Sequence, residues 1–283
     1  MLGRKSSQFY WEQVAKKGTS KKAKNYTTIG FNDLIDNFIG IGFELEFDAD
    51  NPRFPYYLRG QIAYILIENN IDNEYFIETD RSLGYGYELI SQPHTIDALR
   101  LFLDNKMTSI LEQIQQTEAE NHCETAGLHI HISKKLFGET TEIQQDNVAK
   151  LWWLISSERD FMKKLSNRKF LLTCDIKNFN TTDEAKEFVK TTWESKKKKD
   201  KYYAINCKNK DTIEFRLPAA TTDINELKFV IELYWFLANK STTIAWDDLY
   251  HSLKWFEDMP EICKERIDTS TLIHQTYPIN KQV

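Results

Sequence analysis

The 283-residue sequence lacks the patterns that would assign it to a secreted, membrane or zinc-binding class. Its four cysteines lie far apart and form no CxxC pair, which suits a reducing cytosol better than a disulfide or zinc framework. No apolar run is long enough to span a bilayer, and the N-terminus has no apolar core of signal-peptide length. We therefore expect a cytoplasmic protein that does not enter a membrane.

Phosphate-binding glycine loops are also missing. Neither GxxxxGK[ST] nor GxGxxG occurs in the chain. If the protein binds a nucleotide, metals and side chains must hold it rather than a glycine-rich loop. There is likewise no internal repeat and no low-complexity linker that would divide the chain into separate domains.

The net charge of −5 is distributed unevenly. The first 24 residues contain seven lysines or arginines against one acid, Glu12, so the remainder holds 30 basic and 41 acidic residues. This acidic excess argues against a body that mainly binds nucleic acid. We expect residues 1–36 to form a solvated basic extension, with phosphate contact as the alternative, and residues 37–283 to form the folded domain.

Apolar periodicity predicts both helices and strands. Strands are predicted at 39–47, 75–80, 87–92, 126–133, 202–207 and 211–217. Helices are predicted at 57–69, after Thr95, and at 145–165, 183–191, 224–238 and 246–257. Because these elements mix without regular βαβ alternation, we predict one α+β domain with helices packed on a largely antiparallel sheet.

Charged residues alternate with apolar ones on three of the predicted strands, and residues two apart share a face of a strand. The strand IGIGFELEF carries Glu44 and Glu46 between apolar neighbours. An isolated pair of this kind is usually solvent-facing, but the flanking apolar residues indicate a deeply set strand. Carboxylate oxygens are preferred ligands of Mg²⁺ and Mn²⁺, so the pair favours a divalent cation site.

A second strand, AGLHIHIS, carries His129 and His131 on one face. A single buried histidine is usually a core residue, whereas an HxH pair is a stronger signal for a metal ligand. The pair also fits a cupin-type oxygenase. That alternative is disfavoured because Lys134, Lys135 and then Leu136 follow where a glutamate would be needed, and no second motif of this kind occurs downstream.

The third strand, DTIEFRLP, places Glu214 and Arg216 on one face. The simplest interpretation is a surface ion pair, which would contribute little stability. The functional interpretation is a metal ligand beside a guanidinium that grips a phosphate, the arrangement needed for phosphoryl transfer.

Four motifs occur in a defined order: FELEF, TDRSLGYGYELIS, AGLHIHIS and YYAINCKNKDTIEFRLPAAT. Together they resemble the amidoligase family, part of the glutamine synthetase and glutamate–cysteine ligase superfamily of carboxylate–amine ligases. The resemblance extends over about residues 38–240 and includes LSNR, ending at Arg168, as an arginine that precedes the last hairpin. It implies a glutamine synthetase catalytic-domain-like fold with two or three Mg²⁺ or Mn²⁺ ions between ATP and an acid substrate.

Two sets of metal ligands follow from this resemblance. Glu44, His129 and Glu214 would hold the ion that bridges the nucleotide phosphates. The ion near the acid substrate would be held by Glu46, Asp80 and Glu88, and Glu88 is counted among the catalytic residues as well.

The resemblance also implies roles for residues that bind no metal. Arg216 would steady the transferring phosphoryl group, and Arg168 would pair with a phosphate or a substrate carboxylate. Ser133, with His129 and Arg216, would line the nucleotide site. His131 and Glu78 are left between a supporting and a structural role.

The reaction implied is ATP-dependent formation of an amide bond through an acyl phosphate, with a carboxylate and an amine as substrates on a small molecule, peptide or protein. Two other classes remain open: a metal-dependent phosphotransferase or hydrolase, and an inactive binding module on the same fold. Residues 170–203 are either a lid over the acceptor site or a variable surface loop, and the run Lys196–Lys199 is expected to be a solvated loop.

Overall fold

The structure is a computed structural model of the chain. It describes residues 39–49, 55–69, 75–79, 87–117, 119–120, 126–168 and 174–267. The predicted basic extension and the predicted metal ligand Asp80 lie outside the described residues, so both stay predictions.

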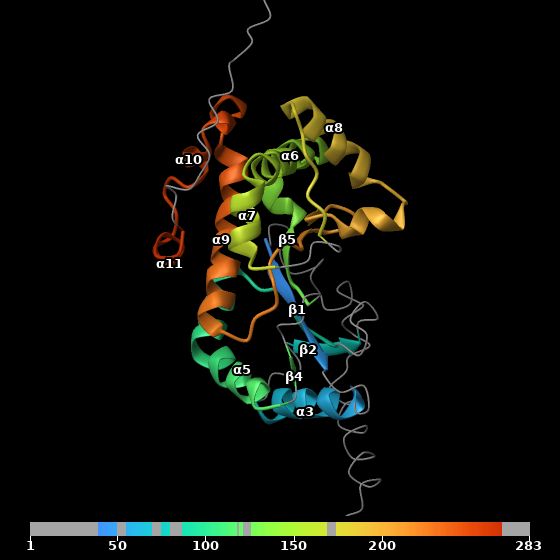
Figure 1. The fold of residues 1–283 in the computed structure, drawn as a ribbon, viewed down its shortest axis with the longest axis vertical. Helices are drawn as coiled ribbons and strands as arrows, with labels where there is room; N and C mark the ends of the chain where they lie inside the picture. The colour runs from blue at the N-terminus through green and yellow to red at the C-terminus, as the bar shows by residue number, and fades with distance from the viewer. Residues whose placement is uncertain are drawn as a thin grey trace, which may run out of the picture. The chain divides into compact units, whose positions relative to one another are not determined.

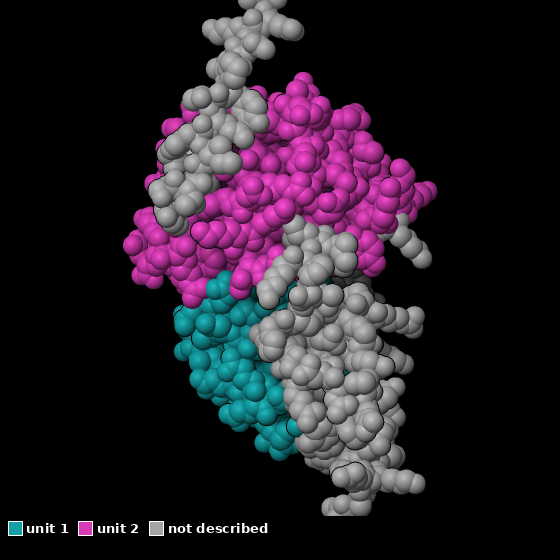
Figure 2. Space-filling view, in the orientation of Figure 1, with its two compact units in different colours: residues 1–131, 218–228 teal, residues 132–217, 229–283 magenta. Residues whose placement is uncertain are grey.

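The chain divides into two compact units, drawn in different colours in Figure 2. Unit 1 comprises Met1–His131 and Pro218–Lys228, and unit 2 comprises Ile132–Leu217 and Phe229–Val283. The sheet has the strand order β2-β3-β1-β5-β7-β6, with β4 paired to β1 off this path. The described pairings β1–β3, β1–β4, β2–β3 and β6–β7 are all antiparallel.

Unit 1 is built on the strands β1 (Ile41–Ala49), β2 (Tyr75–Thr79) and β3 (Tyr87–Ser91), the short β4 (Ala119–Glu120) and the first part of β5 (Leu128–Ser133). The apolar residues Ile41, Phe43, Leu45 and Phe47 alternate along β1 and are all buried. Since residues two apart share a face of a strand, Glu44 and Glu46 lie together on the opposite face.

Unit 1 also contains helical segments. Helix α3 (Pro55–Glu68) contacts both β2 and α5 (Thr108–Gln115), as Figure 1 shows for α3 and α5. The predicted long helix after Thr95 is present as α4 (Ile96–Phe102), a π-helical turn η1 (Leu103–Met107) and α5. Thr95 caps it as expected, because its hydroxyl accepts a hydrogen bond from the Ala98 amide.

Most of the helices that the structure describes lie in unit 2. They are α6 (Thr141–Ser157), α7 (Arg159–Ser166), α8 (Thr182–Trp193), most of α9 (Ile224–Thr243), α10 (Ser252–Trp255) and α11 (Glu261–Lys264), together with the short turns η2 (Lys134–Phe137), η3 (Lys198–Tyr202) and η4 (Trp246–Tyr250). Helix α6 contacts α7 and α8. The prediction of one continuous helix over 145–165 was wrong, because the helix is interrupted at Glu158, between α6 and α7.

The core of unit 2 is aromatic. Trp152 on α6 is fully buried and meets Phe179, Phe188 and Tyr203 edge to face, with ring centroids 6.0, 5.1 and 6.2 Å away. Such edge-to-face pairs add to the stabilisation from buried area alone. This cluster fixes the start of the hairpin formed by β6 (Ile205–Asn206) and β7 (Thr212–Phe215) against α6 and α8.

The predicted fold class is confirmed: helices pack on an antiparallel sheet in an α+β arrangement. Within the described part of the chain, no helix combines the length and the apolar character needed to cross a membrane.

Candidate metal centre

The centre of the candidate site is the carboxylate of Glu44 on β1. One of its oxygens, Oε2, lies 3.3 Å from Nδ1 of His129, and the other, Oε1, lies 3.3 Å from Nε2 of His131. Both histidines belong to β5, the strand next to β1 in the sheet. The two-residue period of β5 therefore places two imidazoles against one carboxylate.

This arrangement lowers the pKa of Glu44. Burial alone would raise the pKa, but the charge of His131 and the hydrogen bonds from His129 and His131 outweigh it and hold the pKa well below its ordinary value. Glu44 is therefore ionised at neutral pH, which is the state that a metal ligand requires.

Glu46 lies two residues further along β1 and is almost fully buried. Its Oε1 is 3.5 Å from Nε2 of His129, so His129 lies between the two glutamates. The other oxygen, Oε2, accepts a hydrogen bond of 2.5 Å from the backbone amide of Gly127. A buried carboxylate is costly without such partners, and the Gly127 amide offsets part of that cost.

Glu46 also belongs to a row of glutamates that crosses three strands. It is the register partner of Glu88 on β3, and Glu88 is the register partner of Glu78 on β2. Directly opposed residues of antiparallel strands lie on the same face with Cβ atoms about 4.5–5.5 Å apart, and like charges there are destabilising. The row thus joins two of the predicted ligands of the second ion, Glu46 and Glu88, while Asp80 lies outside the described residues.

Glu214 of unit 2 is held by its own hairpin. Its Oε2 accepts hydrogen bonds from the side-chain amides of Asn206, at 2.6 Å, and Asn209, at 3.1 Å, and its Oε1 pairs with Nη1 of Arg216. Three donors converge on one buried carboxylate, so the ionised form is hydrogen-bonded and its orientation is fixed. We call Asn206, Asn209 and Arg216 the Glu214 clamp.

The predicted arginines meet in the same unit. Nη1 of Arg168, which is buried beside α7, donates a 2.8 Å hydrogen bond to the carbonyl oxygen of Arg216. Burial raises the pKa of the Cys174 thiol, and the positive charges of Arg168 and Arg216 both oppose that rise, so both guanidiniums are close to this sulfur. Ser133 has a different contact: its hydroxyl accepts a hydrogen bond from the Lys135 amide and caps η2.

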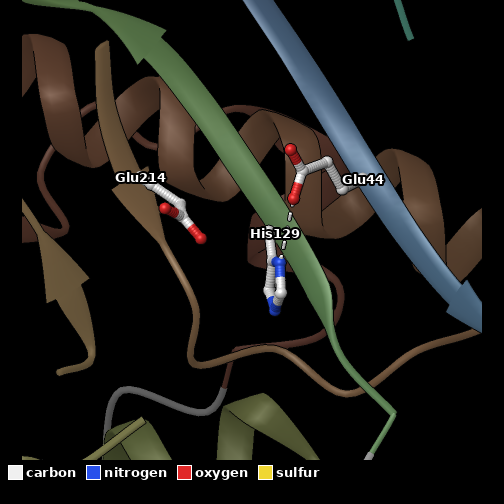
Figure 3. Close-up of side chains that lie close together, drawn as sticks. All are labelled: Glu44, His129 and Glu214. Atoms are coloured by element: carbon white, nitrogen blue, oxygen red, sulfur yellow. Dashed lines mark hydrogen bonds and ion pairs between the residues drawn. The ribbon is translucent and has the colours of Figure 1, made fainter. Parts of the chain in front are cut away.

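Figure 3 labels Glu44, His129 and Glu214, the three residues to which the amidoligase resemblance assigns one ion, and draws the hydrogen bond between Glu44 and His129. The structure does not test which residues bind an ion, so every ligand assignment, including that of Asp80, stays a prediction.

Sequence reasoning missed the two asparagines of the clamp and the Gly127 amide. Asn206 and Asn209 are inside the last motif, but asparagine in a hairpin is ordinarily a turn residue, and Asn206 does also accept a hydrogen bond from the Lys208 amide. A sequence does not show which backbone amides donate hydrogen bonds to a side chain. No signal in the chain would therefore have identified these three donors.

No protein-family model matches the chain, and no curated protein matches it either. Among solved structures, the chain is similar to a cryo-EM structure of glutamine synthetase from Plasmodium falciparum, with 13% sequence identity and a TM-score of 0.38. The similarity covers 82% of this chain and 55% of that chain. The amidoligase resemblance of the four motifs therefore stays a prediction from sequence.

Proposed function

We propose that the protein is an ATP-dependent carboxylate–amine ligase that uses Mg²⁺ or Mn²⁺ and forms an amide through an acyl phosphate. The observation that carries the proposal is the Glu44 carboxylate set between two imidazoles, with Glu46 on the other side of His129. This is a concentration of metal-ligating groups, and it falls on the motifs that resemble the amidoligases.

The donors fit a divalent cation. Carboxylate oxygens suit Mg²⁺ and Mn²⁺, and an imidazole suits Mn²⁺ better than Mg²⁺. Glu44, His129 and Glu214 would hold one ion, and Glu46 with Glu88 and Asp80 would hold another. When bound, such ions supply neutralisation of phosphate charge.

The remaining roles belong to the protein's own side chains. Arg216 is fixed by its ion pair with Glu214 and would place a guanidinium against the transferring phosphoryl group. Arg168 would pair with a phosphate or with the substrate carboxylate. A carboxylate oxygen of the acid substrate forms a bond to the γ-phosphorus of ATP as the bond to ADP breaks, and the amine then displaces phosphate and loses a proton. Since these steps need positioning more than covalent help, the side chains act mainly by orientation.

The test of the proposal is ADP release, measured with acids and amines added singly and together, with mass spectrometry of the products. An acyl phosphate must be kept from water until the amine arrives, so ADP release should be slow without an acceptor. The right pair should accelerate it and give a product that is one water lighter than the sum of the two substrates. Fast ADP release that no pair changes, with no condensed product, would instead favour a hydrolase.

Metal binding is tested separately by thermal unfolding. Mg²⁺ or Mn²⁺ at about 100 times its dissociation constant should stabilise the protein by about 2.7 kcal/mol. The double variant Glu44→Gln/Glu46→Gln should lose this response. The matched control is Glu112→Gln on an exposed part of α5, which should respond as the wild type does. Equal responses of the wild type and the double variant would contradict the assignment.

A further inference from the structure

The lysines of one basic segment of unit 2 have no part in the chemistry described so far. Residues 194–211 contain seven lysines and three acids, on a chain whose net charge is −5. Five of these lysines are exposed and define what we call the lysine ridge: Lys196, Lys197, Lys199, Lys201 and Lys210. A concentration of one charge sign on a surface attracts partners of the opposite sign.

The acidic residue in the middle of this segment is buried. Asp200 stands between Lys199 and Lys201 in the sequence, yet it is buried, and its carboxylate accepts a hydrogen bond from the Ser195 hydroxyl. The segment is also tied down, because Nζ of Lys208 donates a 2.6 Å hydrogen bond to the carbonyl oxygen of Lys197. The fold thus leaves the five lysines of the ridge exposed and buries the Asp200 carboxylate that lies between two of them in the sequence.

The neighbouring aromatic rings favour one kind of anionic partner over another. Three rings each carry a lysine ammonium: Tyr202 beneath Lys201 at 4.8 Å, Tyr203 beneath Lys177 at 5.0 Å, and Trp193 beneath Lys134 at 4.1 Å. Proteins that bind single-stranded nucleic acid stack the bases on aromatic faces, and here a cation already lies over each of these rings.

We propose that the lysine ridge docks an acidic polypeptide, a stretch rich in aspartate and glutamate. Lys210 lies in the turn of the β6–β7 hairpin, and the same hairpin carries Glu214 and Arg216. A chain held on the ridge is therefore recruited by the unit that carries the proposed phosphoryl-binding arginine. On the basis of the proposed function, the carboxylate substrate belongs to this acidic polypeptide.

The experiment is fluorescence anisotropy with three labelled probes: a glutamate–alanine peptide, a glutamine–alanine peptide of equal length, and a single-stranded oligothymidylate of equal charge. The full chain is used with EDTA and without ATP, so a failure of ligase activity leaves the binding result intact. The glutamate peptide should bind at least about tenfold more tightly than the glutamine peptide, and raising the salt from about 50 to 200 mM should weaken its binding.

Charge reversal locates the binding surface. The variant Lys196→Glu/Lys197→Glu/Lys199→Glu should bind the glutamate peptide at least about tenfold more weakly than the wild type. The control variant reverses three exposed lysines elsewhere in unit 2, Lys164, Lys254 and Lys264, and so makes the same change in net charge. It should retain wild-type binding, and thermal unfolding checks that both variants fold.

Three results would overturn the proposal. Equal binding of the glutamate and glutamine peptides would show that carboxylates are not recognised. Equal loss in the two charge-reversal variants would show that only net charge matters. Tighter binding of the oligothymidylate than of the glutamate peptide would assign the ridge to nucleic acid.

Discussion

Removing one donor of the Glu214 clamp should weaken both metal binding and the fold. The perturbation is Asn206→Ala, which deletes the 2.6 Å hydrogen bond from Nδ2 to Oε2 of Glu214 and leaves the contacts of Asn209 and Arg216 in place. Asn206 is buried, so water cannot readily replace the lost donor. The Glu214 carboxylate then has more freedom to rotate away from the orientation that the clamp fixes.

The magnitudes follow from these contacts. A hydrogen bond to a charged group contributes about 1.5–3 kcal/mol, so the free energy of unfolding should fall by roughly that amount. Loss of a residue that orients a metal ligand typically weakens metal affinity about 10–100-fold, and we expect this range for Mn²⁺. Asn209→Ala should have the same sign and a smaller effect, because its contact is longer, at 3.1 Å, and less buried.

Two assays separate these effects: urea unfolding in EDTA gives stability, and electron paramagnetic resonance of free Mn²⁺ gives affinity. The matched control is Asn178→Ala, since Asn178 is exposed in the same unit and accepts a 2.9 Å hydrogen bond from Arg159 without contacting Glu214. If Asn206→Ala binds Mn²⁺ within about twofold of Asn178→Ala, the clamp does not position a ligand and the reasoning is wrong.

The variant Asn206→Asp distinguishes the donor from the acceptor role of this side chain. An aspartate still offers an oxygen to the Lys208 amide, but it faces Glu214 with a second carboxylate. Two such carboxylates share a proton, so the folded-state pKa of one rises above its unfolded value. The stabilisation from that proton is present below the unfolded pKa and is lost as the pH rises through the folded pKa. In EDTA, this variant should therefore lose stability relative to the wild type between acid and neutral pH, and a pH-independent difference would contradict the argument.

Three further predictions concern other parts of the molecule. Because the folded-state pKa of Glu44 is lowered from 4.5, Glu44 contributes stability above pH 4.5 that is lost as the pH falls through the folded pKa; urea unfolding of the wild type and Glu44→Gln in EDTA should therefore converge in acid. Burial raises the pKa of the Cys207 and Cys263 thiols to about 12 each, so iodoacetamide at about pH 8 should label neither until urea unfolds the protein, and peptide mass spectrometry reads this out. Trp152→Ala should lower the free energy of unfolding by about 3–5 kcal/mol, because it empties the centre of the aromatic core of unit 2; a loss below about 1 kcal/mol would mean that the cluster is not a core.

The fold class was predictable because apolar periodicity controls which face of each element is buried. The alternation around Glu44 and Glu46 predicted the buried strand β1, and Thr95 predicted the start of α4. The π-helical turn Leu103–Met107 was not predictable. The spacing of the apolar residues does not change there, and no particular residue type marks the extra residue of a π-helical turn. The break at Glu158 was missed for a similar reason: no proline or glycine marks it.

The candidate site was predictable where it depends on the spacing of residues along a single strand. His129 and His131 are two residues apart, so predicting the strand also predicts that they share one of its faces. Both contact Glu44. Which strands are neighbours depends on tertiary pairing, so spacing alone could not show that Glu46 opposes Glu88. The roles of the ligands, of Arg168 and of Ser133 stay predictions.

The row formed by Glu78, Glu88 and Glu46 has a consequence for self-association. Strand β2 stands at the end of the strand order, and an edge strand is a template on which a second copy of the chain can add its own strand. A second copy that paired with β2 would lie beside Glu78, the last glutamate of this row. The charges that make this face of the sheet suitable for a cation therefore also discourage aggregation through β2.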